Sequence, residues 1–183
     1  GTLDGVVLSG TGQEKGPLVA AGKALANLLC ALRGPEYVSA LVYGLSLGGY
    51  GRSFRKETDT NSWLSRDREM VEDNRRDPLC TFHPTVSMFR DMLGGIQFIR
   101  KPENLARMDM DLPVYFFSGD RDPVGAMGKG VRKVEKLFRE AGCRDVTVKL
   151  YPGGRHEMLN EINRLEVMED LLAWLEVKVC RRE

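Results

Sequence analysis

Two side chains that can act together in proton transfer each follow a short apolar run in the second half of the chain. Asp122 comes shortly after residues 112–118, within Gly-Asp-Arg-Asp-Pro-Val-Gly, and His156 comes shortly after residues 146–151, within Gly-Gly-Arg-His-Glu. Both runs have the pattern of buried strands. An imidazole can take up and release a proton near neutral pH, and a carboxylate beside it can orient the ring. The spacing therefore predicts an acid and a base at the ends of successive strands.

Two aspartates compete for the role of the acid. In an open parallel sheet, functional groups gather at the carboxyl ends of the strands, and both Asp120 and Asp122 lie there. Asp122 follows a tight turn and Pro123 then fixes the backbone, which suits the acid, but these features alone leave Asp120 open as the competitor. The alternative is that either aspartate only caps a helix that begins near Gly130.

The two histidines differ in their sequence context. A lone histidine is more often a surface or hydrogen-bonded core residue than a functional one. For His156, the carboxylate of Asp122 one strand-helix-strand unit earlier favours a functional role instead. His83 lies between Phe82 and Pro84, and we expect it to be structural or to line a pocket.

Strands and helices alternate around these two residues. The expected strands are residues 5–9, 113–117 and 146–150, and the expected helices are 17–32, 130–141 and 167–179. Such alternation predicts a parallel sheet covered on both faces. Three strands are few for such a sheet, and the first residues already resemble the interior of a fold. We therefore expect further strands before residue 1.

The segment between the first two strands is too long for a single crossover helix. Its expected parts are a possible short helix at 36–47, an irregular loop at 48–61, a helix at 63–76 capped by Ser62, and an amphipathic helix at 86–98. A cap over a pocket accounts for such an insertion. The expected division is a core of residues 1–12 and 106–183, and a connecting helix and helical cap of residues 13–105.

Composition argues against several classes of protein. The chain of 183 residues has a net charge of +1, which gives no reason to expect nucleic acid as a partner. No apolar run approaches the ~20 residues that cross a bilayer, so no stable membrane anchor is expected. Its cysteines are scattered without metal-ligand spacing, which favours a reducing cytoplasm over a disulfide framework or a metal site. We expect no cofactor, since the glycines at 10 and 12 lack the remaining residues of a phosphate-binding loop.

Five segments carry a more specific resemblance: residues 9–12, 63–67, 77–80, 119–125 and 154–157. With them the chain resembles, from Leu3 to Val179, the C-terminal part of the serine-hydrolase family of monoacylglycerol lipases and lysophospholipase-like enzymes, which have the α/β-hydrolase fold. The resemblance implies that Asp122 is the acid, His156 the general base and the helical insertion a lid. In this fold the nucleophile precedes the acid and the histidine along the chain.

One serine upstream of Asp122 lies in a nucleophile-like motif. Residues 44–48 read Gly-Leu-Ser-Leu-Gly, which matches the Gly-x-Ser-x-Gly elbow around Ser46. An elbow needs a strand before the serine and a helix after it. Residues 37–43 could form such a strand, but two more glycines follow Gly48 without helical periodicity. We therefore expect Ser46 to be a decoy within the cap, away from His156, and the true elbow to precede residue 1.

These observations predict a hydrolase of lipid-like carboxylic esters that uses a Ser-Asp-His triad. The expected partners are a small lipid ester and the missing N-terminal segment of the same protein, without which the 183 residues should be inactive. Other outcomes on the same fold are an aminopeptidase-type or haloperoxidase-like enzyme, a non-catalytic binding protein, or an inert fragment. The simplest way to distinguish them is to read the sequence before Gly1: a strand, a Gly-x-Ser-x-Gly motif and a helix there would support the enzyme, and a chain that truly starts at Gly1 would support the binding protein or the inert fragment.

Overall fold

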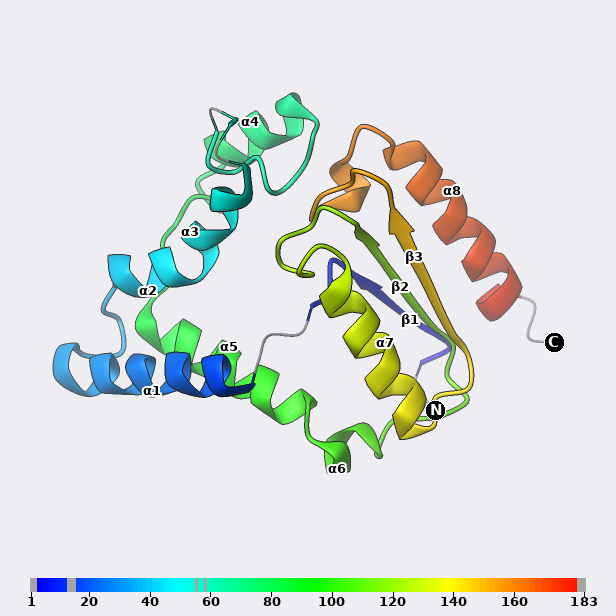
Figure 1. Cartoon of the computed structure of the whole chain (residues 1–183), viewed down its shortest axis with the longest axis horizontal. Coiled ribbons are helices and arrows are strands. Elements are labelled where there is room, and N and C mark those ends of the chain that lie inside the picture. The colour runs from blue at the N-terminus through cyan, green and yellow to red at the C-terminus, as the bar shows by residue number, and fades with distance from the viewer. Residues whose placement is uncertain (1–2, 13–15, 55, 58, 181–183) are drawn as a thin grey trace.

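A computed structural model of the chain describes residues 3–12, 16–54, 56–57 and 59–180. A small sheet with a helix on each face lies beside a separate group of helices (Figure 1). The sheet contains β1 (Val6–Ser9), β2 (Val114–Gly119) and β3 (Val146–Tyr151). The expected boundary between core and cap falls at residue 13, which lies outside the described residues.

The sheet is parallel, as the alternation of strands and helices predicts. Its order is β1-β2-β3, with Val6 opposite Val114 and Val114 opposite Val146. The central strand β2 is buried along its whole length. Among the described residues, β1 pairs with β2 alone and so forms one edge of the sheet. Because all three strands run the same way, the loops that leave their carboxyl ends meet at one edge of the molecule.

Alternate side chains of β2 enter two separate cores. On one face, α8 (Arg164–Leu175) packs against a cluster of buried aromatic and aliphatic side chains: Tyr115, Phe117, Tyr151, Met158, Val167 and Trp174. On the other face, α7 (Lys129–Ala141) covers a second cluster: Val114, Phe116, Val131, Cys143 and Val146. Two apolar faces on one short strand make the sheet a rigid base for the loops at its end.

The helical group has a core of its own. Its two longest helices, α1 (Gly16–Arg33) and α5 (Val86–Ile99), lie side by side at its base (Figure 1). Val42, Val86 and Phe89 are the buried centre of this core. The shorter helices are α2 (Ala40–Leu45), α3 (Leu47–Tyr50), α4 (Arg68–Arg76) and α6 (Pro102–Leu105).

The helix expected at residues 63–76 begins five residues later than predicted. Asp67, not Ser62, is the N-cap of α4, and its Oδ1 accepts a hydrogen bond of 3.1 Å from the amide of Glu69. An ionised N-cap carboxylate suits the positive end of a helix better than a serine hydroxyl. The residues from Trp63 to Asp67 are irregular instead, and their backbone pairs with another loop, as described below.

Smaller corrections concern three other segments. The loop expected at residues 48–61 contains α3 and a 3₁₀ turn at Gly51–Phe54. The possible helix at 36–47 begins only at Ala40, because Ser39 caps it. The last helix starts one turn before residue 167 and ends in a π turn at Glu176–Cys180.

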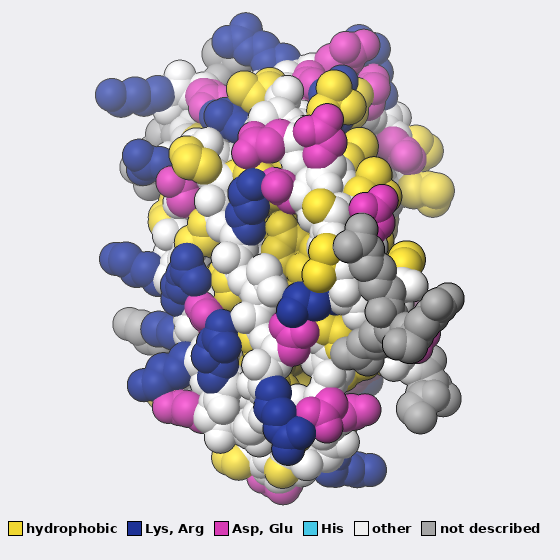
Figure 2. Space-filling model, turned by 90° about the vertical axis from the view of Figure 1, so that its right-hand side faces the viewer, with side chains coloured by type: hydrophobic (Ala, Val, Ile, Leu, Met, Phe, Trp, Pro, Cys, Tyr) yellow, Lys and Arg dark blue, Asp and Glu magenta, His cyan; other side chains and the backbone are white. Residues whose placement is uncertain are grey.

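Charges are mixed on the face that α8 presents to solvent. Figure 2 shows Lys and Arg interspersed there with Asp and Glu, with hydrophobic side chains visible between them. Leu165 and Leu172 of α8 are more than half exposed. This face carries no field of a single sign that would attract a polyanion.

A close backbone approach at the end of β2 gives the first prediction. A Cβ added to Gly119 would lie 1.9 Å from the carbonyl oxygen of Gly154, whereas one added to Gly95 in α5 would meet nothing within 4 Å. We expect Gly119→Ala to lower the free energy of unfolding by at least about 2 kcal/mol, and Gly95→Ala to raise it by about 0.5–1 kcal/mol. Urea titration of the two variants checks this. Equal effects would contradict the close packing of the two loops.

Candidate active site

Asp122 is fully buried and is oriented by three hydrogen-bond donors. Its Oδ1 accepts from the amide of Val124 at 2.8 Å, and its Oδ2 accepts from the Ser118 hydroxyl at 3.2 Å. The third partner of the carboxylate is Nδ1 of His156, 3.0 Å from Oδ2. These three contacts fix the direction of the carboxylate.

His156 lies just beyond β3 with its ring partly open to solvent, at 28% side-chain exposure. Beside an ionised carboxylate, which can only accept, the Nδ1 atom is the donor of this hydrogen bond. Nε2 is then the unprotonated nitrogen, and no hydrogen bond among the described residues involves it. The arrangement leaves Nε2, the ring nitrogen that does not face the acid, without a hydrogen-bond partner among the described residues.

Asp120, the competing aspartate, holds a different part of the site. Its Oδ1 accepts the amide of Gly153 at 2.7 Å, at the start of the loop that carries His156. Neither aspartate caps the following helix, because α7 begins after Gly128 without a side-chain cap. The geometry therefore assigns the imidazole to Asp122 and the loop backbone to Asp120.

The loop after β1 also reaches the site, which the sequence reasoning did not foresee. Gly10 has a φ of +59°, and a Cβ placed on it would lie 2.8 Å from the His156 ring. A Cβ on Gly12 would lie 2.2 Å from the carbonyl oxygen of Val124. The two glycines thus let the backbone pass close to both the imidazole and the acid loop. Their position one and three residues past a strand end was the available signal.

Trp63 is the second residue that the sequence did not place at the site. Its ring centroid lies 5.2 Å from that of His156, at an interplanar angle of 39°. Its carbonyl oxygen accepts the amide of His156 at 3.3 Å, and the carbonyl of Leu64 accepts the amide of Glu157 at 2.8 Å. On its other side the Trp63 ring lies 5.1 Å from that of Tyr50. Residues 63–67, which the sequence predicted to be helical, therefore pack as an irregular segment against the loop that carries His156.

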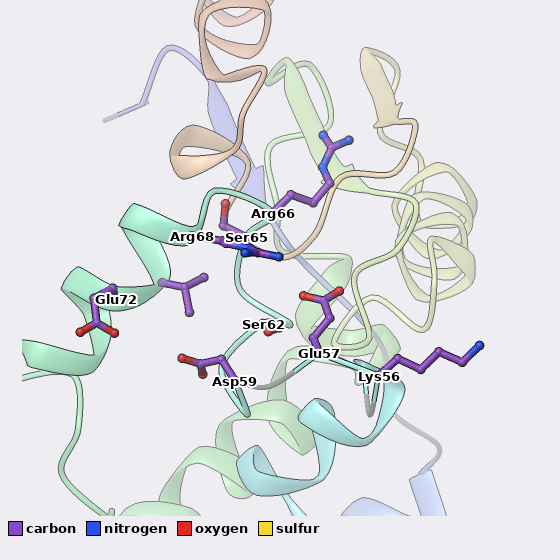
Figure 3. Close-up of a pocket in the computed structure, with 9 residues that line it drawn as sticks. Lys56, Glu57, Asp59, Ser62, Ser65, Arg66, Arg68 and Glu72 are labelled. Carbon is purple, nitrogen blue, oxygen red and sulfur yellow. The ribbon is translucent and has the colours of Figure 1, made fainter.

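A buried carboxylate connects the segment before α4 to the loop that carries His156 through hydrogen bonds. Glu161 is fully buried, and its two oxygens accept from the amide of Arg66 at 3.1 Å, from Nε of Arg66 at 2.9 Å and from the amide of Arg155 at 3.0 Å. Figure 3 shows the Arg66 side chain extending from the segment before α4 toward the loops of the sheet. A polar pocket of about 430 Å³ opens beside it.

Ser46 does not have the surroundings of a nucleophile elbow. It lies between α2 and α3, so a helix precedes it where an elbow needs a strand. Its hydroxyl donates to the carbonyl oxygens of Val42 at 2.7 Å and Tyr43 at 3.2 Å. His83 is also in the helical group, where its ring lies edge-on to Tyr43 at 4.4 Å, in keeping with a structural role.

An apolar cavity of about 420 Å³ lies between the helical group and the acid loop. Its lining includes Thr11 and Val124 from the strand-end loops, and Ile96 and Phe98 from α5. A second apolar cavity, of about 350 Å³, lies among α1, α2 and α5 and shares Tyr50 and Ile96 with the first.

Within the described residues, no cluster of three or more potential metal ligands occurs. None of the described helices is long and apolar enough to cross a membrane.

The family of the chain follows from comparison with known proteins. Residues 1–163 match the model of the family described as serine aminopeptidase, S33. The chain belongs to this family, which has the α/β-hydrolase fold, and the resemblance drawn from the sequence is confirmed at this level.

Similar solved structures are esterases and lipases. A highly thermostable carboxyl esterase from Bacillus coagulans, in complex with glycerol, is 26% identical with a TM-score of 0.86, over 97% of this chain and 57% of the other. A lipase in an open form is 26% identical with a TM-score of 0.73, over 98% and 58%. A monoacylglycerol lipase from Paleococcus ferrophilus shares the fold at 20% identity and a TM-score of 0.65, over 94% and 58%. The chain spans somewhat more than half the length of each structure.

The surroundings of Ser46 give the second prediction. In the full-length protein we expect Ser46→Ala to leave the rate of labelling by a fluorophosphonate within about twofold, because the hydroxyl only bonds back to its own helix. Treatment with a fluorophosphonate, followed by peptide mapping, should leave the Ser46 peptide unmodified. A phosphonylated Ser46 would contradict the assignment.

Proposed function

We propose that the protein is a serine hydrolase of carboxylic esters, in which Asp122 is the acid and His156 the general base of a Ser-Asp-His triad. The observation that carries the proposal is the 3.0 Å hydrogen bond between Nδ1 of His156 and Oδ2 of the buried Asp122, with the His156 side chain 28% exposed. Membership of an α/β-hydrolase family and the likeness to esterases and lipases support the reaction class.

In the proposed reaction, Nε2 of His156 removes the proton of a serine hydroxyl as its oxygen attacks the ester carbonyl. Asp122 keeps the ring in the required tautomer and stabilises the imidazolium that forms. The imidazolium then gives the proton to the leaving alcohol, which breaks the ester bond and leaves an acyl-serine. A water molecule, activated by the same nitrogen, releases the carboxylic acid and restores the serine.

We place the nucleophile in a segment of the protein outside these 183 residues. Two serines at the site are already engaged, since Ser118 donates to Asp122 and Ser65 donates to the carbonyl oxygen of Asn160 at 2.7 Å. Ser46 bonds to its own helix. The solved structures that the chain resembles are longer than the chain, which leaves room for an elbow before β1. On this proposal the 183 residues alone do not hydrolyse esters.

The helical group, residues 13–105, is proposed to be a cap over the site, on a core made of residues 1–12 and 106–183. The two apolar cavities support a lipid-like substrate, because they lead from the strand-end loops into the helical group and are lined mainly by aliphatic and aromatic side chains. The described cysteines are all free thiols, which supports the proposal of a cytoplasmic location.

A peptidase is the second candidate, because the matched family is described as serine aminopeptidase. The same acid and base can catalyse attack on an amide carbonyl. The lining of the substrate pocket, and not the triad, therefore distinguishes an esterase from a peptidase. The apolar lining of the larger cavity favours an ester with a long acyl chain. A panel of p-nitrophenyl esters of increasing acyl length, beside aminoacyl p-nitroanilides, separates the candidates.

The third prediction tests the two proposed catalytic residues in the full-length protein. Asp122→Asn and His156→Gln should each lower kcat/KM for a p-nitrophenyl ester by at least about 10³-fold, because the tautomer or the base is lost. His83→Gln is the matched control and should change it less than about threefold. Ester hydrolysis that survives His156→Gln would refute the triad, and a wild-type protein that binds esters without cleaving them would indicate a binding protein.

A further inference from the structure

The residue before the histidine directs its whole side chain into the helical group. Arg155 is buried, and its Nη1 donates to the carbonyl oxygens of Ser62 and of Ser65, the latter at 3.1 Å. The same nitrogen lies 3.0 Å from Oε2 of Glu57, and Nη2 donates to Oε1 of Glu57. The guanidinium also stacks over the Phe54 ring, 4.3 Å from its centroid. All these partners come from one stretch of chain, residues 54–65.

Glu57 is the acid that Arg155 contacts among the described residues, and it lines the polar pocket. Figure 3 shows its carboxylate beside Ser62, in the pocket that Ser65 and Arg66 also line. Its side chain is 43% exposed, so the pair is buried on the arginine side and open on the glutamate side. The hydrogen bond from Arg155 holds the pKa of Glu57 below its ordinary value. The two-point geometry of the pair requires a guanidinium, because an ammonium offers no fork.

The stretch that Arg155 holds is the one that contacts His156. Trp63 lies between Ser62 and Ser65, its ring lies against the imidazole, and its carbonyl accepts the His156 amide. The hydrogen bond to Asp122 fixes the position of Nδ1, but by itself it allows the imidazole ring to rotate about the Nδ1–Oδ2 direction. The Trp63 ring, tilted by 39° with its centroid 5.2 Å away, packs against the imidazole and restricts this rotation. Displacement of residues 62–65 therefore changes the direction of Nε2 without breaking the hydrogen bond to Asp122.

We propose that Arg155, through its ion pair with Glu57, is a positioning residue that holds Trp63 against the imidazole and so aims Nε2 of His156. The role of His156 as a base rests on the function proposed above. The positioning itself is a statement about the ring, and it can be measured without catalysis. Because residues 54–65 belong to the insertion between β1 and β2, this contact makes the geometry of the base depend on the docking of the helical group.

The test uses conservative variants of the full-length protein. Glu57→Gln keeps the size of an exposed side chain and removes its charge, and Arg155→Lys keeps the charge and removes the fork. We expect each to lower kcat for ester hydrolysis by about tenfold or more, since misplacement by ~1 Å can cost about 100-fold, with KM changed less than about twofold. Trp63→Leu should have the same effect, and Trp63→Phe should restore most of the rate.

A double-mutant cycle of Glu57→Gln and Trp63→Leu shows whether Glu57 acts on kcat through Trp63 or independently of it. If Glu57 acts through Trp63, then Glu57→Gln added to Trp63→Leu lowers kcat no further. The matched control is Arg144→Met, which removes an exposed ion pair with Asp111 of 2.5 Å, beyond the opposite end of β3. It should leave kcat and KM unchanged. Strictly additive losses, or losses confined to KM, would overturn the proposal.

A second readout does not depend on activity. The ring-proton NMR signals of His156 can be identified as those missing from His156→Gln. Glu57→Gln should shift these signals and leave those of His83 in place. Unchanged His156 signals would overturn the positioning role even if esterase activity falls. A protein without esterase activity but with shifted His156 signals would refute the proposed function and leave the positioning intact.

Discussion

The hydrogen bond between His156 and the buried Asp122 is the interaction on which the rest of the site depends. A fully buried carboxylate is costly without partners, so the donors around Asp122 are a condition of the fold as well as of any chemistry. The bond exists because β2 and β3 are neighbours and run in parallel, which brings the loops after them to one edge. Gly119 and Gly154 allow those loops to approach, and the amide of Arg121 donates to the carbonyl oxygen of Gly154 at 2.9 Å.

The parts of this arrangement that depend on local pattern could be predicted from the sequence. The apolar runs around residues 114–119 and 146–151 are the central and edge strands of the sheet. Strand-end position indicated His156 and two candidate acids, Asp120 and Asp122, and the family resemblance selected Asp122. The structure brings Asp122 and His156 within hydrogen-bond distance. The Gly-x-Ser-x-Gly motif at Ser46 lacks an elbow's context for a different reason from the one the sequence suggested: the short helix α3 does follow the serine, but a helix and not a strand precedes it.

The parts that depend on contacts between distant segments could not be predicted in this way. Trp63 has helix-compatible neighbours, and nothing local shows that its carbonyl accepts an amide 93 residues later. Arg155 resembles a surface charge in a polar loop, yet the hydrogen bonds of its guanidinium and its contact with Phe54 are all with residues 54–65. Both residues are exceptions to local propensity at a candidate functional site, where tertiary demands are expected to override local preference.

The most direct test of the account is a crystal structure of the full-length protein after reaction with a fluorophosphonate. The account predicts one phosphonylated serine, outside the 183 residues, with its oxygen within about 3.2 Å of Nε2 of His156. It also predicts that Nδ1 of His156 remains bonded to Asp122. Phosphonylation of Ser46, or a modified serine far from His156, would contradict the claim that these two residues complete a serine-hydrolase triad.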